Sequence, residues 1–222
     1  MPVESNRFLR VNVGCGATPT RGWMNFDNSL TVRLARVPLI VEVLAGLQLV
    51  GDHQLKFARI VRREGIRWAD ATRRLPLPDA CAGVVYSSHM LEHLDPASEV
   101  PRFLSEVLRI LVPNGILRLA VPDLRQRAER YLATGDADEF VASLRMAGGT
   151  PRGLLAVARH LVAGYRNHRW MYDAQSLIRL LKLHGFRDPR ALPAGETAIP
   201  EPGPLNLRER EEESVYVEGY RP

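Results

Sequence analysis

The chain has 222 residues, of which 45% are hydrophobic and 25% charged, which is typical of a globular protein with one large domain, or a domain with a cap. Two cysteines, Cys15 and Cys81, exclude a disulfide framework and favour a reducing compartment, so we expect a cytoplasmic protein. The N-terminus lacks the apolar stretch of a signal peptide. The longest apolar run, 37–50, predicts an amphipathic helix and is too short for a transmembrane span.

The net charge of +5 and the pI near 9.6 raise the question of a nucleic-acid partner. All basic residues except Lys56 and Lys182 are arginines, and they are scattered along the chain. They form no basic stripe interleaved with aromatic side chains, which is the pattern expected of a nucleic-acid surface. We therefore do not expect nucleic acid as the main partner.

The first part of the chain predicts two short strands that end at residues suited to a ligand. Segment 8–13 is β-rich and runs into the glycine turn Gly14-Cys15-Gly16. Segment 23–27 is a second strand candidate, and it ends at Asp27. The residues between these strands leave little room for a helix. Helical spacing follows at 32–50 and 54–64.

The middle of the chain continues the alternation of strands and helices. A short strand at 66–69 ends at Asp70, and a loop with two prolines covers 72–82. Buried-type strands are predicted at 83–87 and 116–121. We expect a helix to begin near His89, and another to run from Asp95 to about Val112.

The last part of the chain changes character. Residues 123–165 are helical and rich in arginine, which predicts an inserted helical cap. A helix from Asp173 to His184 is expected to have an aspartate N-cap, and a final strand is expected at 214–220, with a loop at 189–204. We expect three parts: a core at 1–122, a cap at 123–170 that faces the substrate, and a segment at 171–222 that completes the core.

Strands that alternate with helices predict an α/β protein with a Rossmann-like, mostly parallel sheet and an antiparallel last strand. In such sheets ligands bind beyond the carboxyl ends of the strands. Polar and glycine residues close several predicted strands, at Gly14–Gly16, Asp27, Asp70, Ser87–His89 and Asp123.

Six segments together resemble one family: VNVGCG, GWMNFD, WADATRRLPLPD, VVYSSHMLEHL, FLSEVLRILVPNGILRLAVPDL and LLKLHGF. They resemble the class I S-adenosylmethionine (SAM)-dependent methyltransferases. More narrowly, they resemble type 11-like bacterial members, some of them associated with glycan or polysaccharide biosynthesis. The resemblance covers residues 9–124 well and 172–186 moderately. It implies a seven-stranded sheet and SAM as the cofactor.

The resemblance also implies which residues contact the cofactor. The glycine loop would lie against the methionine half of SAM, Asp27 would bind the ribose hydroxyls and Asp70 the adenine amino group. The residues at the end of the fourth strand would line the sulfonium pocket. The full set expected to bind the cofactor is Val13, Gly14, Cys15, Gly16, Asp27, Asn28, Asp70, Ala71, Ser87, Ser88 and His89.

An alcohol acceptor must lose a proton when it is methylated, so a base at the mouth of the pocket is expected. The candidates are His89, Asp123, His168 and Tyr172. We expect the acceptor to be a small molecule or a saccharide, methylated at oxygen. A homodimer is left open.

Three alternatives remain beside this function. A glycine turn followed by an acid also fits a dinucleotide-dependent oxidoreductase, although G-x-G-x-x-G is absent. A non-catalytic binding protein could keep the same fold. His89, Glu92 and His93 also spell the H-x-x-E-H pattern of inverted zinc peptidases. No downstream acid stands out as a third ligand for zinc, so we expect no metal site.

Overall fold

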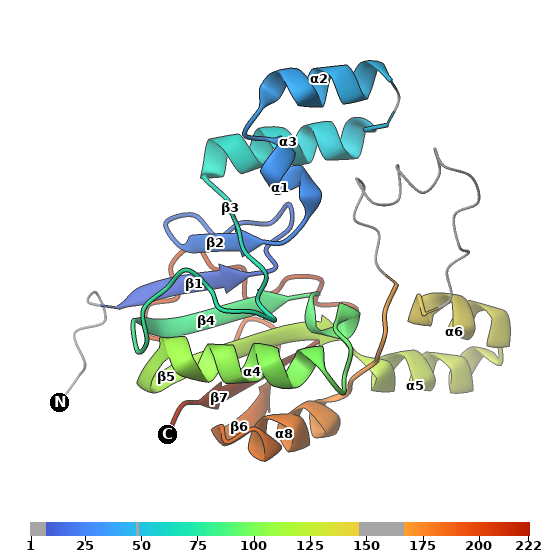
Figure 1. The fold of residues 1–222 in the computed structure, drawn as a ribbon. Helices are drawn as coiled ribbons and strands as arrows, with labels where there is room; N and C mark the ends of the chain where they lie inside the picture. The colour runs from blue at the N-terminus through green and yellow to red at the C-terminus, as the bar shows by residue number, and fades with distance from the viewer. Residues whose placement is uncertain (1–7, 48, 147–166) are drawn as a thin grey trace.

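The computed structural model describes residues 8–47, 49–146 and 167–222 (Figure 1). Seven strands form one sheet in the order β3-β2-β1-β4-β5-β7-β6. They are β1 (Leu9–Val13), β2 (Met24–Asp27), β3 (Arg67–Trp68), β4 (Ala82–Ser88), β5 (Leu111–Pro122), β6 (Arg187–Leu192) and β7 (Ser214–Tyr220). Only the pairs that include β7 are antiparallel. The predicted α/β sheet, mostly parallel with an antiparallel last strand, is confirmed.

Helices cover one face of this sheet. The helices α4 (Glu99–Ile110) and α8 (Ala174–Leu183) lie side by side with their apolar sides on the strands (Figure 1). Phe103 of α4 and Leu177 of α8 are completely buried there, in one cluster with Val85 and Leu117 of the sheet. Burying such side chains is the main stabilising contribution to a fold of this kind.

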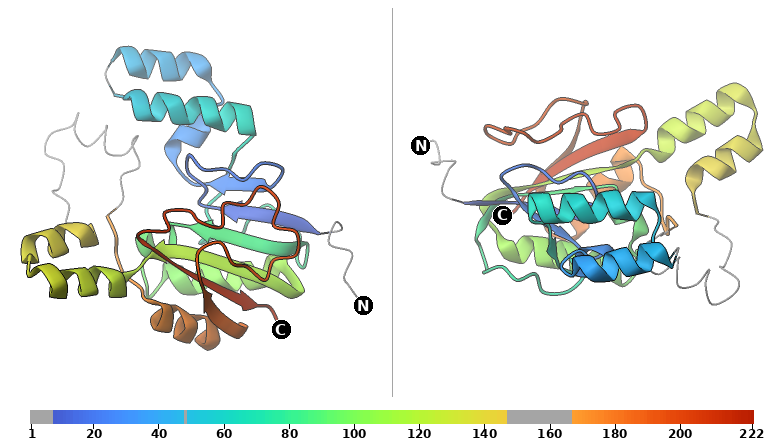
Figure 2. Two further views of the ribbon diagram at one scale, coloured as in Figure 1. Left: turned by 180° about the vertical axis from the view of Figure 1, so that it is seen from behind. Right: turned by 90° about the horizontal axis from the view of Figure 1, so that it is seen from above.

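The opposite face is covered by a long loop rather than by helices. The chain from residue 193 to 213, between β6 and β7, crosses this face, as the left view of Figure 2 shows. Its Ile199 and Leu205 pack against Tyr86 of β4 and Tyr216 of β7. Both faces are thus covered, as the alternating pattern predicted, but by different means.

Three helices follow β2 and lie over the β2–β3 edge (Figure 1): α1 (Leu30–Leu34), α2 (Pro38–Gly46) and α3 (Asp52–Glu64). They share a second apolar cluster with Cys15. The prediction of one continuous helix over 32–50 is wrong. The chain breaks before Pro38, because a residue that precedes proline is driven out of the helical region. Val37 has φ −123° and ψ 85°.

The region after β4 also differs from the prediction. No α-helix begins at His89, and only a single 3-10 turn, η1 (Leu91–His93), follows. The next helix begins at Glu99 instead of Asp95, because the Asp95 carboxylate accepts the backbone N–H of Ser98 at 2.9 Å and holds a turn there. The loop expected at 189–204 in fact begins with residues of β6, an edge strand whose register shifts near Pro189.

Helices α5 (Leu124–Thr134) and α6 (Ala137–Leu144) extend from the carboxyl end of β5 (Figure 1). They lie in the part of the chain predicted to be a cap, of which residues 147–166 lie outside the described residues. The domain boundaries and the substrate role of the cap remain predictions. No helix among the described residues has the length and apolar character needed to cross a bilayer.

Candidate functional site

The glycine loop and Asp27 lie against each other at the carboxyl ends of β1 and β2. The N–H groups of Gly14 and Cys15 donate to the carbonyl of Phe26, at 2.8 and 3.1 Å. The N–H of Gly16 donates to Oδ2 of Asp27 at 3.0 Å. Residues 14–23 contain no helix, as the sequence predicted. The loop is therefore held in place by backbone contacts with β2 and by the Asp27 carboxylate.

Gly14 and Gly16 both have a left-handed backbone, with φ of 69° and 50°, a conformation that favours glycine. A Cβ atom on Gly14 would lie 2.4 Å from Cγ of Met90, so packing alone requires glycine there. A Cβ on Gly16 would have no heavy atom within 4 Å. Gly16 thus borders open space beside Asp27.

The Asp27 carboxylate keeps unused hydrogen-bonding capacity. Its Oδ1 accepts the N–H of Ser29 at 2.8 Å, and its Oδ2 accepts that of Gly16. A carboxylate offers about four acceptor positions, so about two remain. Two hydroxyl groups of a ribose need such acceptors, and the half-buried Asp27 therefore fits a nucleoside at this edge of the sheet.

The other residues expected near this edge have local contacts. Val13 is buried in the core, and the Asn28 carbonyl accepts Nε1–H of Trp68 at 3.0 Å, which fastens β3 to the end of β2. The Cys15 side chain packs beneath α1–α3, and burial raises the pKa of its thiol. A cofactor contact for these three residues remains a prediction.

Asp70 follows β3 and lies close to the end of β2, because the N–H of Ala69 donates to the carbonyl of Asp27 at 3.2 Å. Its Oδ1 accepts both the N–H and the hydroxyl of Thr72, at 3.0 and 2.7 Å. These bonds give Asp70 a turn-forming role. Ala71, beside it, is buried in the main core. The predicted adenine contact of Asp70 and Ala71 remains untested.

β4 ends at Ser88, beside the loop and next to β5. The side-chain oxygens of Ser87 and Ser88 are buried and have no hydrogen-bond partner among the residues that the structure describes. His89 has φ 48°, and its N–H donates to the carbonyl of Ala120 at 2.9 Å. This left-handed residue ends the strand and prevents a helix from starting there.

A cluster of imidazoles surrounds the buried carboxylate of Glu92. Nδ1 of His89 lies 3.5 Å from Oε1 of Glu92, and Nε2 of His89 lies 2.9 Å from Oγ of Ser214. Nε2 of His93 lies 3.9 Å from the same Glu92 oxygen. His168 packs against His93, with ring centroids 5.0 Å apart. Burial lowers the pKa of His168.

Tyr172 and Asp123 lie next to this cluster. The two residues pair as a parallel β-bridge, and the N–H of Leu124 donates to the carbonyl of Tyr172 at 2.8 Å. Burial, followed by the charge of Glu92, raises the pKa of Tyr172 to about 12. Burial also raises the pKa of Asp123, whose side chain caps α5 by accepting the N–H of Arg125.

Three of the four predicted bases, His89, His168 and Tyr172, therefore interact with one carboxylate, and Asp123 adjoins them through the backbone. Sequence reasoning did not include Glu92 among the site residues. The H-x-x-E-H spacing was the signal that could have identified it, but its third histidine comes from a distant part of the chain.

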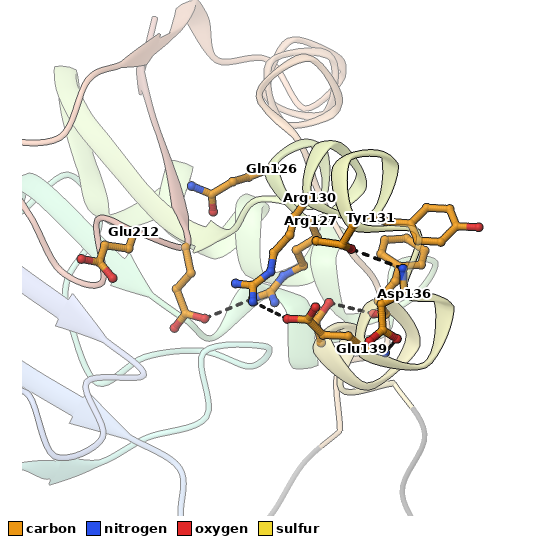
Figure 3. A pocket seen from close by; sticks show the side chains of 11 residues that line it. Gln126, Arg127, Arg130, Tyr131, Asp136, Glu139 and Glu212 are labelled. Carbon is orange, nitrogen blue, oxygen red and sulfur yellow. Dashed lines mark hydrogen bonds and ion pairs between the residues drawn. The ribbon is translucent and has the colours of Figure 1, made fainter.

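A cavity of about 330 Å³ lies between α5, α6 and the turn at residues 212–213 (Figure 3). Its arginines already have acidic partners: Arg127 pairs with Glu213 at 3.2 Å, and Arg130 pairs with Glu139. The stacked rings of Tyr131 and Phe140 close one wall. This cavity is separate from the strand ends at which the predicted cofactor residues lie.

Comparison with known proteins finds a related family for one part of the chain. Residues 11–119, just under half of the chain, match the family model described as a methyltransferase domain. The matched segment runs from β1 into β5 and includes the glycine loop, Asp27 and the turn η1 that carries Glu92. No curated protein matches the chain.

Solved structures share the fold at low sequence identity. A SAM-dependent methyltransferase from Thermotoga maritima is similar with a TM-score of 0.51 and 16% identity, over 96% of this chain and 82% of that one. A SAM-dependent methyltransferase from Methanosarcina mazei gives a TM-score of 0.50 and 14% identity, over 100% and 97%. At these identities the solved structures show the fold, and the matched segment is similar to a methyltransferase domain.

Proposed function

We propose that this protein, whose residues 11–119 match the methyltransferase domain family, transfers a methyl group from SAM to an oxygen atom of a small-molecule or saccharide acceptor. The observation that carries the proposal is the convergence of the glycine loop and Asp27. The loop donates to Asp27 through Gly16, and open space borders that glycine. The carboxylate keeps unused acceptor positions, and these could accept hydrogen bonds from the two hydroxyl groups of a ribose.

SAM, when bound, supplies an activated methyl group on a sulfonium. The protein must then align the acceptor oxygen with that methyl group and exclude water. His89 is the proposed base, because it ends β4 and its Nε2 already engages a hydroxyl, that of Ser214, at 2.9 Å. An acceptor hydroxyl in the place of Ser214 would give its proton to the same nitrogen.

A saccharide acceptor is supported by an aromatic side chain beside the cluster. Trp170 is 49% exposed, and its backbone N–H donates to the carbonyl of Glu92 at 3.2 Å, which holds the residue beside the cluster. An exposed indole offers a flat apolar surface with one polar edge, which suits a sugar ring. The resemblance to members associated with glycan biosynthesis favours the same acceptor class. We expect the protein to act in the cytoplasm.

Calorimetric titration of SAM and NAD into the purified protein tests the proposal. We expect SAM to bind and NAD to show no binding. Asp27→Ala should abolish SAM binding, because it removes the acceptors of the ribose and the anchor of Gly16. Asp188→Ala, which changes an aspartate with an exposed side chain in β6, is the matched control and should bind like the parent.

If Asp27→Ala binds SAM as tightly as the parent, the assignment of this edge to the cofactor is wrong. If NAD binds and SAM does not, the protein is an oxidoreductase instead. If neither ligand binds, the non-catalytic alternative holds.

A further inference from the structure

Glu92 is a buried carboxylate without a hydrogen-bond partner. Its residue is 1% exposed, and both Oε1 and Oε2 lack a partner among the residues described. Arg169, on the neighbouring segment, does not pair with Glu92. Its guanidinium lies 3.4 Å from Glu99 and 3.8 Å from Asp95. A buried, unpaired carboxylate is strongly unfavourable, so a positive group is expected next to it.

His93 is arranged as a metal ligand on the same side. Its Nδ1 lies 3.2 Å from the carbonyl of Asn167, an acceptor, so this nitrogen carries the proton. The other nitrogen, Nε2, then presents a lone pair, and it lies 3.9 Å from Oε1 of Glu92. Two electron-rich atoms at this separation cannot bond to each other. A carbonyl that fixes the tautomer of a histidine is the usual support of a metal-ligating imidazole.

His168 completes the group from a different part of the chain. The segment that carries it is fixed to η1, because the N–H groups of Arg169 and Trp170 both donate to the Glu92 carbonyl, at 2.7 and 3.2 Å. His168 is 6% exposed, and its Nδ1 has no hydrogen-bond partner within the described ranges. This nitrogen is therefore available as a ligand atom.

We propose that Glu92, His93 and His168 bind one divalent transition-metal ion. One ligand atom from each residue lies within 4.8 Å of the other two. Metal bonds of about 2.0–2.2 Å require ligand atoms roughly 3–4 Å apart, so small side-chain adjustments complete the geometry. Two imidazoles and a carboxylate suit zinc, manganese, iron or cobalt rather than magnesium or calcium, which take oxygen ligands.

The proposed site departs from the expectation of no metal that was drawn from the sequence. It differs from the zinc peptidase pattern, which would use His89 and His93 as ligands. Here Nδ1 of His89 lies 3.5 Å from Oε1 of Glu92, and Nε2 of His89 contacts Ser214, so His89 is not counted among the ligands. The proposed ligands include no residue of the Asp27 edge.

Untagged protein stripped of metal with a chelator and titrated with Co²⁺ and Zn²⁺ tests the proposal. We expect one ion per chain and the visible absorption bands of Co²⁺ in a low-symmetry, nitrogen-containing site. His93→Ala and His168→Ala should each weaken binding by at least about tenfold. His53→Ala, which changes an exposed histidine of α3, is the matched control and should bind like the parent.

Thermal unfolding provides a second measurement that does not depend on activity. Zn²⁺ should raise the melting temperature of the parent, and it should not raise that of Glu92→Gln. Without metal, Glu92→Gln should melt no lower than the parent, because it removes an uncompensated buried charge. The proposal is overturned if the parent binds neither ion, if His168→Ala binds as the parent does, or if metal-free Glu92→Gln melts lower. The last result would show that the carboxylate of Glu92 is already stabilised within the metal-free protein.

Discussion

Gly14 and Gly16 share a left-handed backbone, but the structure uses them differently. Gly14 allows Met90 to pack against the loop, whereas Gly16 leaves space free beside Asp27. A substitution at Gly14 would therefore affect packing as well as any ligand. A substitution at Gly16 separates the effect on ligand binding from the effect on packing, because no atom of the described residues fills the space next to Gly16.

Gly16→Ala should weaken SAM binding by more than it lowers stability. The left-handed backbone costs an alanine about 1–2 kcal/mol in the free energy of unfolding, and the added methyl group occupies the space proposed for the cofactor. Gly135→Ala is a matched control, because Gly135 ends α5 with φ 70° and also has no atom within 4 Å of a Cβ. Urea unfolding and SAM calorimetry on both variants measure the difference. Equal SAM affinities in the two variants would contradict the proposed role of Gly16.

At the residue scale, the sequence predicts positions that end a strand, and it predicts distant contacts poorly. Gly16 and Asp27 could be placed together because each closes a strand of one parallel sheet. The contact of His168 with Glu92 and His93 could not be predicted. It depends on how the segment that begins at residue 167 lies against η1, and no local pattern in the sequence encodes that contact.

At the scale of elements, α8 shows how a local signal fixes a helix start. Asp173 accepts the N–H of Ser176 at 2.7 Å, and the Ser176 hydroxyl returns a bond to the N–H of Asp173 at 2.9 Å. The aspartate N-cap lies where the sequence predicted it, and the returning bond from Ser176 makes it a capping box; α8 covers one face of the sheet through Leu177 and Leu181. Such a pattern is readable because all its partners are within four residues.

Asp173→Ala should lower the free energy of unfolding by about 1 kcal/mol at pH 7. The bond from the Ser176 N–H lowers the pKa of Asp173 in the folded protein. A carboxyl with a depressed folded pKa stabilises the fold above its unfolded pKa, near 3.9, and loses that contribution as the pH falls through the folded value. Urea unfolding of both proteins at pH 7 and in acid should therefore show a smaller difference in acid. An unchanged difference would mean that the charge of Asp173 contributes nothing.

The mispredictions of segment 32–50 and of β6 have different reasons. The break before Pro38 was visible in the sequence, but the apolar periodicity of 32–50 outweighed it in the prediction. β6 carries Pro189 and little apolar periodicity, which is why a loop was expected. Its pairing with β7 is an edge contact, where proline is tolerated, so tertiary structure rather than local sequence determines that strand.

At the scale of the whole molecule, the loop at residues 193–213 replaces a layer of helices, and a buried ion pair holds it. Arg118 of β5 and Glu218 of β7 are both completely buried and 2.7 Å apart. Arg118 also donates to the carbonyls of Glu196 and Leu207, and Glu218 accepts from Thr197 and Ala198. The ion pair thus ties the covering loop to two neighbouring strands.

Glu218→Gln should lower the free energy of unfolding by about 3–5 kcal/mol, because it leaves the Arg118 charge buried without a counter-ion. Glu211→Gln removes a similar but exposed pair with Arg208, whose atoms lie 2.8 Å apart, and should cost at most about 1 kcal/mol. Denaturant unfolding of both variants gives the comparison. Equal losses would show that the buried pair does not anchor the loop.

The sheet type followed from the alternation of strands and helices in the sequence, but the covering of the second face by a loop did not. Its loop has few apolar residues, and it is fixed by polar side chains that become buried only when β5 and β7 pair. A polar residue within a strand, such as Arg118, gives no indication of its distant partner.

The measurement that tests the central claim most directly is a crystal structure of the protein with S-adenosylhomocysteine. We expect the ribose hydroxyls to lie within hydrogen-bonding distance of the Asp27 carboxylate, with the amino acid portion against Gly14–Gly16 and the sulfur facing the end of β4. A ligand bound elsewhere, or a ribose without contact to Asp27, would contradict the account.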